Sequence, residues 1–206
     1  IATGATAKYL GIPSEEKFNN KGVSACAVCD GYFYRGKAVA VVGAGDSAAE
    51  EATYLANLCT KVHLIVRRDE MRASKIMQQR VMKTPNIEIH WNTETDEILG
   101  NEGGVTGVRL VNNKTGAKTE IGVEGFFLAI GHKPNTDIFK DYLDMDETGY
   151  IQVLPGSTKT NIEGVFAVGD AADRVYRQAI TAAGTGCMGA LDAEKFLAAK
   201  EMETVH

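Results

Sequence analysis

The sequence predicts an α/β protein built on a Rossmann-like parallel sheet, and three observations support that fold class. Residues 38–66 read as strand, glycine turn, helix and strand, and both strands are rich in valine, isoleucine and alanine. A further helix and strand continue this alternation as far as Trp91. The composition, 44% hydrophobic and 24% charged, is that of an ordinary globular chain. Alternation of this kind indicates parallel strands joined by crossover helices.

The first half of the chain gives the clearest periodicity. Strands are expected at 38–42 and 62–66, with a helix between them that runs to Leu58. A second helix at about 72–83 ends before Pro85, and a strand follows at 87–91.

Next, 107–111 and 117–121 flank the loop 112–116, whose Asn and Gly residues suit a hairpin. This pair indicates a β-meander insertion. The run 126–130 lacks polar alternation and is expected to be a fully buried strand that ends at Gly131.

Beyond Pro134 the character of the chain changes, and we expect a domain boundary near residue 135. A short strand is expected at 150–153, an acid at the tip of a buried strand at 164–170, and a long helix at about 177–200.

The bulk charge argues against two classes of partner. The net charge is -5 and no long basic run is present, so we expect no nucleic-acid binding. The longest apolar stretches are far shorter than the roughly 20 residues that span a bilayer, so we expect no membrane insertion.

Gly43-x-Gly45-x-x-Ala48 follows a strand and opens a helix, which is the context that a dinucleotide fingerprint requires. Small residues there allow a tight turn and close approach of a pyrophosphate to the helix N-terminus. A plain strand–helix turn is the alternative reading.

Arg67, Arg68 and Arg72 stand at and after the end of the next strand, where enzymes that bind NAD usually place an acid. Guanidinium groups at this position can bind a 2′-phosphate, so the sequence favours NADPH over NADH. A solvated basic helix start is the alternative.

Cys26-Ala-Val-Cys29 precedes the first strand, and no second Cys-x-x-Cys follows. Redox use is favoured, and a Cys3His zinc site with Cys59 and His63 is the alternative. Asp30 follows the pair, and a carboxylate there can exchange the proton that thiol–disulfide chemistry requires, although a turn cap is the simpler role.

The remaining cysteines and histidines carry no site prediction. Cys59 and Cys187 are expected to be small buried side chains, and the sparse cysteines favour a reducing compartment. His63 and His90 fall within expected strands, and among the histidines only His132 could line a site.

Near the C-terminus, Asp170 is expected at the tip of the buried strand, and the segment Arg177-Gln178-Ala179 is expected to open a helix poor in bulky side chains. Small side chains let a flat cofactor approach, and the positive helix end could stabilise anionic charge on a reduced flavin. A tight helix–sheet contact is the alternative.

Several of these motifs occur together in one family. The segments Ser24-Ala-Cys-Ala-Val-Cys-Asp-Gly31, Gly45-Asp-Ser-Ala48, Arg67-Arg-Asp69 with Arg72-Ala-Ser74, and Tyr176-Arg-Gln-Ala-Ile-Thr-Ala-Ala-Gly-Thr-Gly-Cys187 resemble the low-molecular-weight, bacterial-type thioredoxin reductases along essentially the whole chain. The family often has His at Val66 and Gly at Ala44, but the arginine pair and the glycines are present.

The resemblance implies two nucleotide-binding, Rossmann-like domains of the pyridine nucleotide-disulfide oxidoreductase type. Residues 1–8 would end an N-terminal FAD-domain segment, 9–135 would bind NADPH and contain the redox disulfide, and 136–206 would complete the FAD domain. The first βαβ unit of the FAD domain is expected to be missing from this chain. The chain alone is therefore expected to bind FAD poorly and to turn over little.

The resemblance also implies residue roles. Cys26 and Cys29 would form the redox disulfide, Cys29 nearer the flavin, with Asp30 as the acid. NADPH would be held by Gly43, Gly45, Ser47, Ala48, Arg67, Arg68 and Arg72. FAD would be held by Asp170, Arg177, Gln178 and Ala179.

The activity implied is thioredoxin-disulfide reduction, with electrons passing from NADPH through FAD to the disulfide and on to thioredoxin. Domain rotation between half-reactions, a homodimer and a cytoplasmic location are further implications. Two alternatives stay open, namely an NADPH-binding module without turnover and a reductase for another small disulfide protein.

Overall fold

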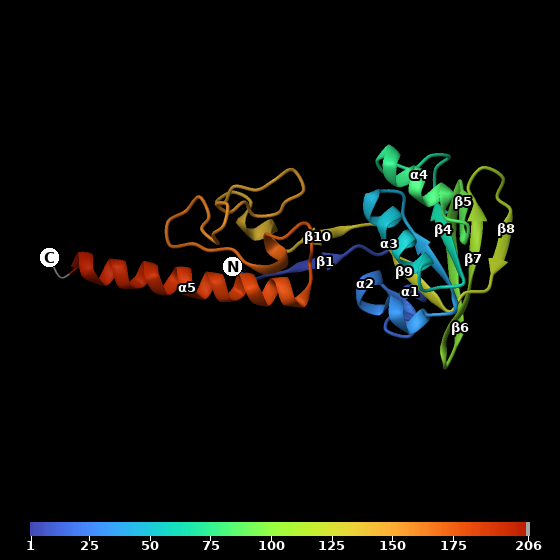
Figure 1. Cartoon of the computed structure of the whole chain (residues 1–206), viewed down its shortest axis with the longest axis horizontal. Coiled ribbons are helices and arrows are strands. Elements are labelled where there is room, and N and C mark those ends of the chain that lie inside the picture. The colour runs from blue at the N-terminus through green and yellow to red at the C-terminus, as the bar shows by residue number, and fades with distance from the viewer. Residues whose placement is uncertain (205–206) are drawn as a thin grey trace. The chain divides into compact units, whose positions relative to one another are not determined.

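The computed structural model describes residues 1–204, which form two compact units. The sheet unit contains residues 8–131, and the helix unit combines residues 1–7 with the chain from residue 132 onward. In Figure 1 the sheet unit runs from blue to yellow-green, and most of the helix unit is orange to red. These divisions fall close to the limits at residues 8 and 135 that the sequence suggested.

A five-stranded parallel sheet forms the centre of the sheet unit. Its order is β2 (Val23–Ser24), β9 (Gly125–Leu128), β3 (Ala38–Val42), β4 (Lys61–Val66) and β5 (Ile87–Trp91). The strands expected at 38–42, 62–66 and 87–91 are all present, and the predicted Rossmann-like α/β fold is confirmed.

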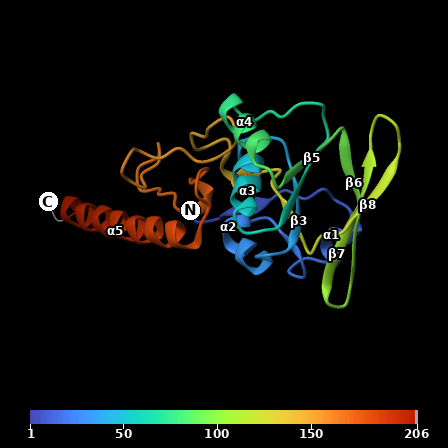
Figure 2. The same cartoon turned by 45° about the vertical axis from the view of Figure 1, so that its right-hand side comes forward.

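Helices α3 (Asp46–Ala56) and α4 (Lys75–Lys83) cover one face of this sheet, as Figures 1 and 2 show. Helix α4 begins three residues later than expected. The reason is that the backbone N–H groups of Arg72 and Ala73 both donate to the carbonyl of Ala44, which fixes that segment as a loop against the glycine turn.

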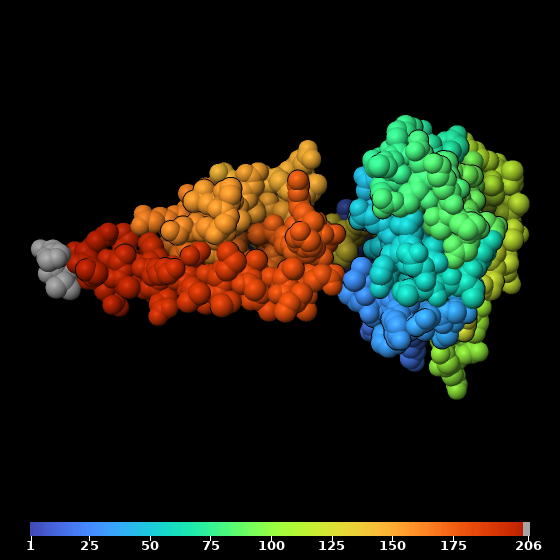
Figure 3. Space-filling model, in the orientation of Figure 1, coloured from blue at the N-terminus to red at the C-terminus, as the bar shows by residue number. Residues whose placement is uncertain are grey.

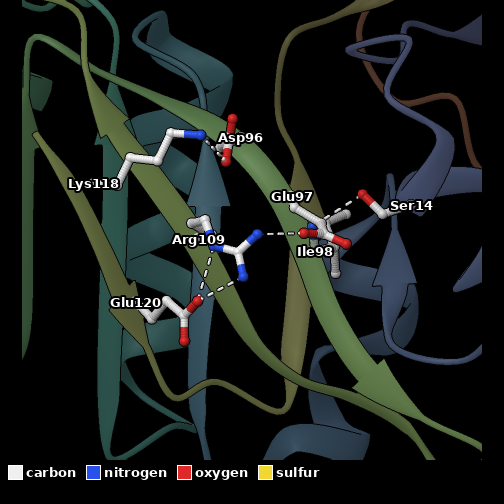
Figure 4. A network of polar contacts seen from close by, with 7 residues as sticks. All are labelled: Ser14, Asp96, Glu97, Ile98, Arg109, Lys118 and Glu120. Atoms are coloured by element: carbon white, nitrogen blue, oxygen red, sulfur yellow. Dashed lines mark hydrogen bonds and ion pairs between the residues drawn. The ribbon is translucent and has the colours of Figure 1, made fainter. Parts of the chain in front are cut away.

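The other face is covered by an antiparallel sheet of β6 (Thr93–Asn101), β7 (Gly104–Asn112) and β8 (Lys118–Ile121). The predicted hairpin is thus present, but β6 was missed because its run Thr-Glu-Thr-Asp-Glu has no apolar alternation. Figure 4 shows the polar side chains that join the three strands: Arg109 donates to Glu120 and Glu97, and Lys118 to Asp96. Ser14 of α1 (Pro13–Lys17) accepts from the N–H of Ile98 in the same view.

The core of the sheet unit depends on Phe127, which is fully buried on β9 and meets the ring of Tyr34 edge-on at 5.3 Å. We expect Phe127→Ala to lower the free energy of unfolding of this unit by about 3–5 kcal/mol, because removing this fully buried ring leaves a cavity inside the core. Urea unfolding followed by the fluorescence of Trp91, the single tryptophan, would measure it. Phe33→Ala, at an exposed ring, is the control and should change stability by less than about 0.5 kcal/mol.

The helix unit contains the two-stranded sheet β1 (Ala5–Ala7) and β10 (His132–Pro134), the 3-10 turns η2 (Asp137–Phe139) and η3 (Gly169–Ala171), and the helix α5 (Ala179–Thr204). A small core cluster forms around Leu143, Ile151, Ala167 and Ala171.

Two strands expected in the helix unit are not formed. Ile151 makes only an isolated bridge with Met145, and Phe166 makes one with Lys159. Gly164 and Gly169 both have positive φ, which bends the backbone out of the extended conformation at each end of 164–169. Asp170 therefore lies in the turn η3 and not at a strand tip.

Loop residues of the helix unit lie along α5, as the orange and red atoms in Figure 3 show. Asp192 accepts hydrogen bonds from Ser157 and Thr158, and the rings of Phe166 and Phe196 meet edge-on at 6.2 Å.

Among the helices in the described part of the chain, none combines the length and the apolar character that a membrane span requires.

Candidate functional site

The structure contains a disulfide between Cys26 and Cys29, with their Cα atoms 5.3 Å apart. Cys26 is the residue that caps helix α2 (Ala27–Asp30), and its sulfur accepts from the N–H of Cys29 at 3.2 Å. The pairing that the family resemblance implied is therefore present, on a short helix that directly follows strand β2.

Asp30 is held next to the disulfide by Ser24. The Ser24 hydroxyl donates to Asp30 Oδ2 at 2.7 Å and accepts from the N–H of Cys26 at 3.1 Å. One hydroxyl thus fixes both the carboxylate and the start of the cysteine turn. The sequence analysis quoted Ser24 within a motif but gave it no role, because only the folded turn brings it back onto Asp30.

The turn that follows is packed firmly against α3. A Cβ added to Gly31, in η1 (Gly31–Tyr34), would lie 2.9 Å from Leu55 Cδ2, so a larger residue there would require the Leu55 side chain to shift. Burial raises the pKa of Tyr34, and the charge of Asp30 raises it further. The cysteine turn is therefore a rigid part of the sheet unit.

Three large apolar side chains near the disulfide are exposed to solvent. Val28, Tyr32 and Phe33 are 62%, 66% and 72% exposed. Apolar side chains grouped in this way are typical of a surface that contacts another protein.

A pocket of about 480 Å³ lies at the carboxyl ends of β3 and β4. It is lined by Tyr9, Leu10, Ile12, Val42, Gly43, Ala44, Ile65, Arg67, Arg68, Arg72, Thr93, Glu94, Thr95 and Ile130. Gly43 has φ +151°, and a Cβ there would lie 2.4 Å from the carbonyl oxygen of Ala129. The tight turn predicted after β3 is thus required by the close packing of Gly43 against Ala129 and Ala48.

The three arginines expected to bind NADPH all line this pocket with exposed side chains. Their backbones are fixed, because the carbonyl of Arg68 accepts from Asn92, that of Arg67 accepts from Asn113, and the N–H of Arg72 donates to Ala44. Within residues 1–204, none of the three guanidinium groups forms an ion pair. The pocket therefore has positive charge available for an anion.

The other fingerprint residues lie outside the pocket lining. Gly45 caps α3 and has open space around it, Ser47 is exposed on the first turn, and Ala48 is fully buried beneath Gly43. Ala48 thus supports the turn from below.

Sequence reasoning missed Thr95, whose buried hydroxyl lines the pocket and has no hydrogen-bond partner. Thr95 lies on β6, which begins shortly after the carboxyl end of the edge strand β5. The available signal was that ligand sites form at the carboxyl ends of parallel strands.

The residues expected to contact FAD lie in the helix unit. Asp170 has a buried carboxylate oxygen, Oδ1, without a partner. Arg177 has φ +47°, and the helix begins at Ala179, two residues later than expected. The carboxylate of Asp173 accepts from the N–H groups of Val175, Tyr176 and Arg177, and this turn keeps the backbone out of the helix.

Comparison with known proteins identifies the family. The model of the pyridine nucleotide-disulphide oxidoreductases matches residues 1–186. The chain belongs to this family.

Among its relatives, the chain is 58% identical to a thioredoxin reductase of Dictyostelium discoideum and 55% identical to one of Escherichia coli O157:H7, each over 96% of this chain. It spans 62% and 64% of the length of those two proteins.

Two solved structures are also similar to it. The thioredoxin reductase of Giardia duodenalis superposes with a TM-score of 0.91 at 47% identity, covering 96% of this chain and 65% of that one. The thioredoxin reductase of Streptococcus pyogenes MGAS5005 gives a TM-score of 0.92 at 40% identity, covering 97% and 65%.

The other two cysteines of this pyridine nucleotide-disulphide oxidoreductase differ from each other. Cys59 is buried as expected, its thiol donates to the carbonyl of Tyr34, and burial raises its pKa to about 11. The expectation for Cys187 was wrong, because its thiol is exposed on α5.

The alternative zinc site with Cys59 and His63 is excluded in this structure, since the sulfurs of Cys26 and Cys29 are bonded to each other.

The turn before Arg177 should be sensitive to acid. Burial acts to raise the pKa of Asp173, but hydrogen bonds from the N–H groups of Tyr176, Val175 and Arg177 lower it overall. A lowered folded-state pKa means that the stabilisation is present above the unfolded pKa of about 3.9 and is lost as the pH falls through the folded value.

We therefore expect Asp173→Asn to destabilise this turn by about 1–3 kcal/mol at pH 7, and the difference from wild type to shrink below about pH 4. Amide hydrogen exchange at residues 175–177, corrected for the intrinsic effect of pH, would measure both. A difference that stays constant down to about pH 2 would contradict the assignment of the charge.

Proposed function

We propose that this chain works in a thioredoxin-disulfide reductase, in which electrons pass from NADPH through FAD to the Cys26–Cys29 disulfide and then to thioredoxin. The observation that supports this best is a disulfide with a carboxylate tied to it through Ser24, in the same unit as a pocket lined by three unpaired arginines. The similar proteins named as thioredoxin reductases support thioredoxin as the proposed substrate.

The pocket fits NADPH. Gly43 packs against Ala129 and Ala48, which fixes the turn, and Gly45 has open space around it at the start of α3. A pyrophosphate would be bound at this helix start together with Ser47. Arg67, Arg68 and Arg72 would hold the 2′-phosphate, and the partnerless hydroxyl of Thr95 is available to a polar ligand atom.

The helix unit fits part of an FAD site. The buried Oδ1 of Asp170 lacks a partner, which a ribose hydroxyl would supply, and Arg177, Gln178 and Ala179 open α5. When bound, FAD would take up the hydride of NADPH and pass an electron pair to the disulfide.

The dithiol form of Cys26 and Cys29 then performs ordinary thiol–disulfide exchange. One thiolate attacks a sulfur of the thioredoxin disulfide, so that a mixed disulfide forms and one thioredoxin thiolate leaves. The second cysteine attacks the mixed disulfide, which closes the Cys26–Cys29 bond again and releases thioredoxin with two thiols. Asp30 is placed to exchange the proton that each step requires.

The surface around the disulfide suits a protein substrate, because Val28, Tyr32 and Phe33 are exposed beside it. We further propose a homodimer and a cytoplasmic location. The proposed location follows from the cysteine content, since two of the four thiols are free and the one disulfide belongs to the proposed reaction.

The domain assignment is proposed on the same basis: residues 9–135 as the NADPH domain with the redox disulfide, and residues 1–8 with 136–206 as parts of the FAD domain.

The test needs no flavin, because thiol–disulfide exchange is reversible. The oxidised chain is incubated anaerobically with excess reduced thioredoxin, free thiols are alkylated, and the labelled cysteines are mapped by mass spectrometry. Label is expected at Cys26 and Cys29 only after incubation with thioredoxin, with an equal amount of thioredoxin oxidised, whereas the exposed Cys187 is labelled in every sample and Cys59 stays unlabelled. If dithiothreitol opens the disulfide and thioredoxin does not, the chain serves another disulfide protein or binds NADPH without turnover.

A further inference from the structure

A second cluster of chemically active side chains lies in the sheet unit and takes no part in the proposed redox reaction. His63 on β4 is the direct neighbour of Glu88 on β5, and His90 follows two residues along β5. Because side chains alternate along a strand, this register puts all three on one face of the sheet. Their nitrogen and oxygen atoms lie within 4.8 Å of one another.

The separations are close to those around one metal ion without being equal to them. His63 Nδ1 and His90 Nε2 are 3.0 Å apart, and Glu88 Oε1 lies 3.7 Å from His90 Nε2 while Glu88 Oε2 lies 4.0 Å from His63 Nδ1. A tetrahedral zinc ion with bonds of about 2.0–2.1 Å places its ligand atoms about 3.3 Å apart. Small side-chain rotations would bring the three groups to that distance.

The surroundings of the cluster suit a bound cation that stays in contact with water. The side chains of His63 and His90 are 12% and 19% exposed, and that of Glu88 is 48% exposed. The ring nitrogens of neutral imidazoles are the commonest metal ligands in proteins. A fourth position would remain for water.

One cation already competes for the carboxylate. Lys61, two residues before His63, places its Nζ 2.8 Å from Glu88 Oε2. An ion bound to the cluster is repelled by this ammonium group and competes with it for the carboxylate. The competition gives a direct way to test the site, because removing Lys61 should strengthen metal binding while removing a ligand weakens it.

We propose that His63, Glu88 and His90 form a binding site for a divalent transition-metal ion of the zinc class, bridging strands β4 and β5. Two imidazoles and one carboxylate are a donor set typical of zinc sites that keep an open position. Magnesium prefers oxygen ligands and waters, so it should not bind here.

The test uses the oxidised chain with Cys187→Ser, so that neither the Cys26–Cys29 pair nor the exposed thiol can bind the metal. Isothermal titration with Zn²⁺ in a buffer that does not chelate it is expected to show one ion per chain. His90→Gln and Glu88→Gln should each weaken binding by more than about tenfold. Lys61→Met should strengthen it, and His132→Gln, which removes a histidine of the helix unit, should leave it unchanged.

Folding of each variant is checked by circular dichroism. If His90→Gln does not fold, Glu88→Gln still tests the site, because the side chain of Glu88 is half exposed and its replacement should not prevent folding. A shift of the His63 and His90 imidazole resonances on addition of Zn²⁺ is the second expected readout.

A dissociation constant above about 1 mM would overturn the proposal. So would an affinity that neither Glu88→Gln nor Lys61→Met changes, or equal binding of Mg²⁺. Failure of this test would leave the proposed reductase function untouched, because the two rest on different residues.

Discussion

Replacing Cys29 with serine is expected to abolish electron exchange with thioredoxin. A serine hydroxyl cannot form a disulfide, so the variant has no Cys26–Cys29 bond that reduced thioredoxin could open. In the opposite direction Cys26 can attack a thioredoxin disulfide once, but the variant cannot close the intramolecular bond that completes the exchange. Cys59 cannot substitute, because burial raises the pKa of its thiol to about 11 and leaves little thiolate at neutral pH. The expected result is complete loss of thioredoxin oxidation in the thiol-mapping experiment.

The same variant provides a positive signal. With a thioredoxin that keeps one of its two cysteines, activated beforehand as a mixed disulfide with a small aromatic thiol, either Cys26→Ser or Cys29→Ser should displace that aromatic thiolate and accumulate a mixed disulfide with thioredoxin. The double variant should not, all three being made in a Cys187→Ser background so that the exposed thiol cannot react. Cys187→Ser is the matched control, since it removes an exposed thiol outside the cysteine turn and should exchange normally. Full exchange by the Cys26→Ser, Cys29→Ser double variant would remove the disulfide from the mechanism.

Replacing Arg67 and Arg68 together with alanine is expected to weaken NADPH binding by about 10- to 100-fold and to leave NADH binding nearly unchanged. Each charge-assisted hydrogen bond to a phosphate contributes about 1.5–3 kcal/mol, and both side chains are exposed, which reduces that value. Neither guanidinium forms an ion pair in the described part of the chain, so their removal leaves no buried acid without a partner.

Titration calorimetry with both nucleotides would measure this change. Arg80→Ala is the control, because Arg80 is an exposed cation on α4 that does not line the pocket. An equal loss of NADPH and NADH binding would mean that the arginines support the pocket as a whole and do not select the 2′-phosphate.

Much of the sheet unit could be predicted because its signals are local. The fingerprint from Gly43 to Ala48 and the apolar strands on either side of it are encoded within about thirty residues, and the structure has them where the sequence placed them. The strand β6 was missed for the converse reason. Its residues are polar, and only pairing with β7 makes that run extended.

The helix unit was predicted less well. Its expected strands at 150–153 and 164–170 reduce to isolated bridges, because two glycines with positive φ interrupt the second run and the first has a single bridge partner. The start of α5 was also placed early, since Asp173 accepts three backbone hydrogen bonds that hold Arg177 outside the helix. Such hydrogen bonds between a side chain and the backbone cannot be predicted from the periodicity of apolar residues along the sequence.

The sequence by itself determined the fold class, the cysteine pair, the glycine turn and the arginines, because each depends on residue type and short spacing. Tertiary structure alone decided which distant groups meet. It brought Ser24 onto Asp30, placed Thr95 in the pocket of the arginines, and set His63 opposite Glu88 through the register of β4 and β5. Register and turn packing arise from the burial of a whole sheet face, and no local segment encodes them.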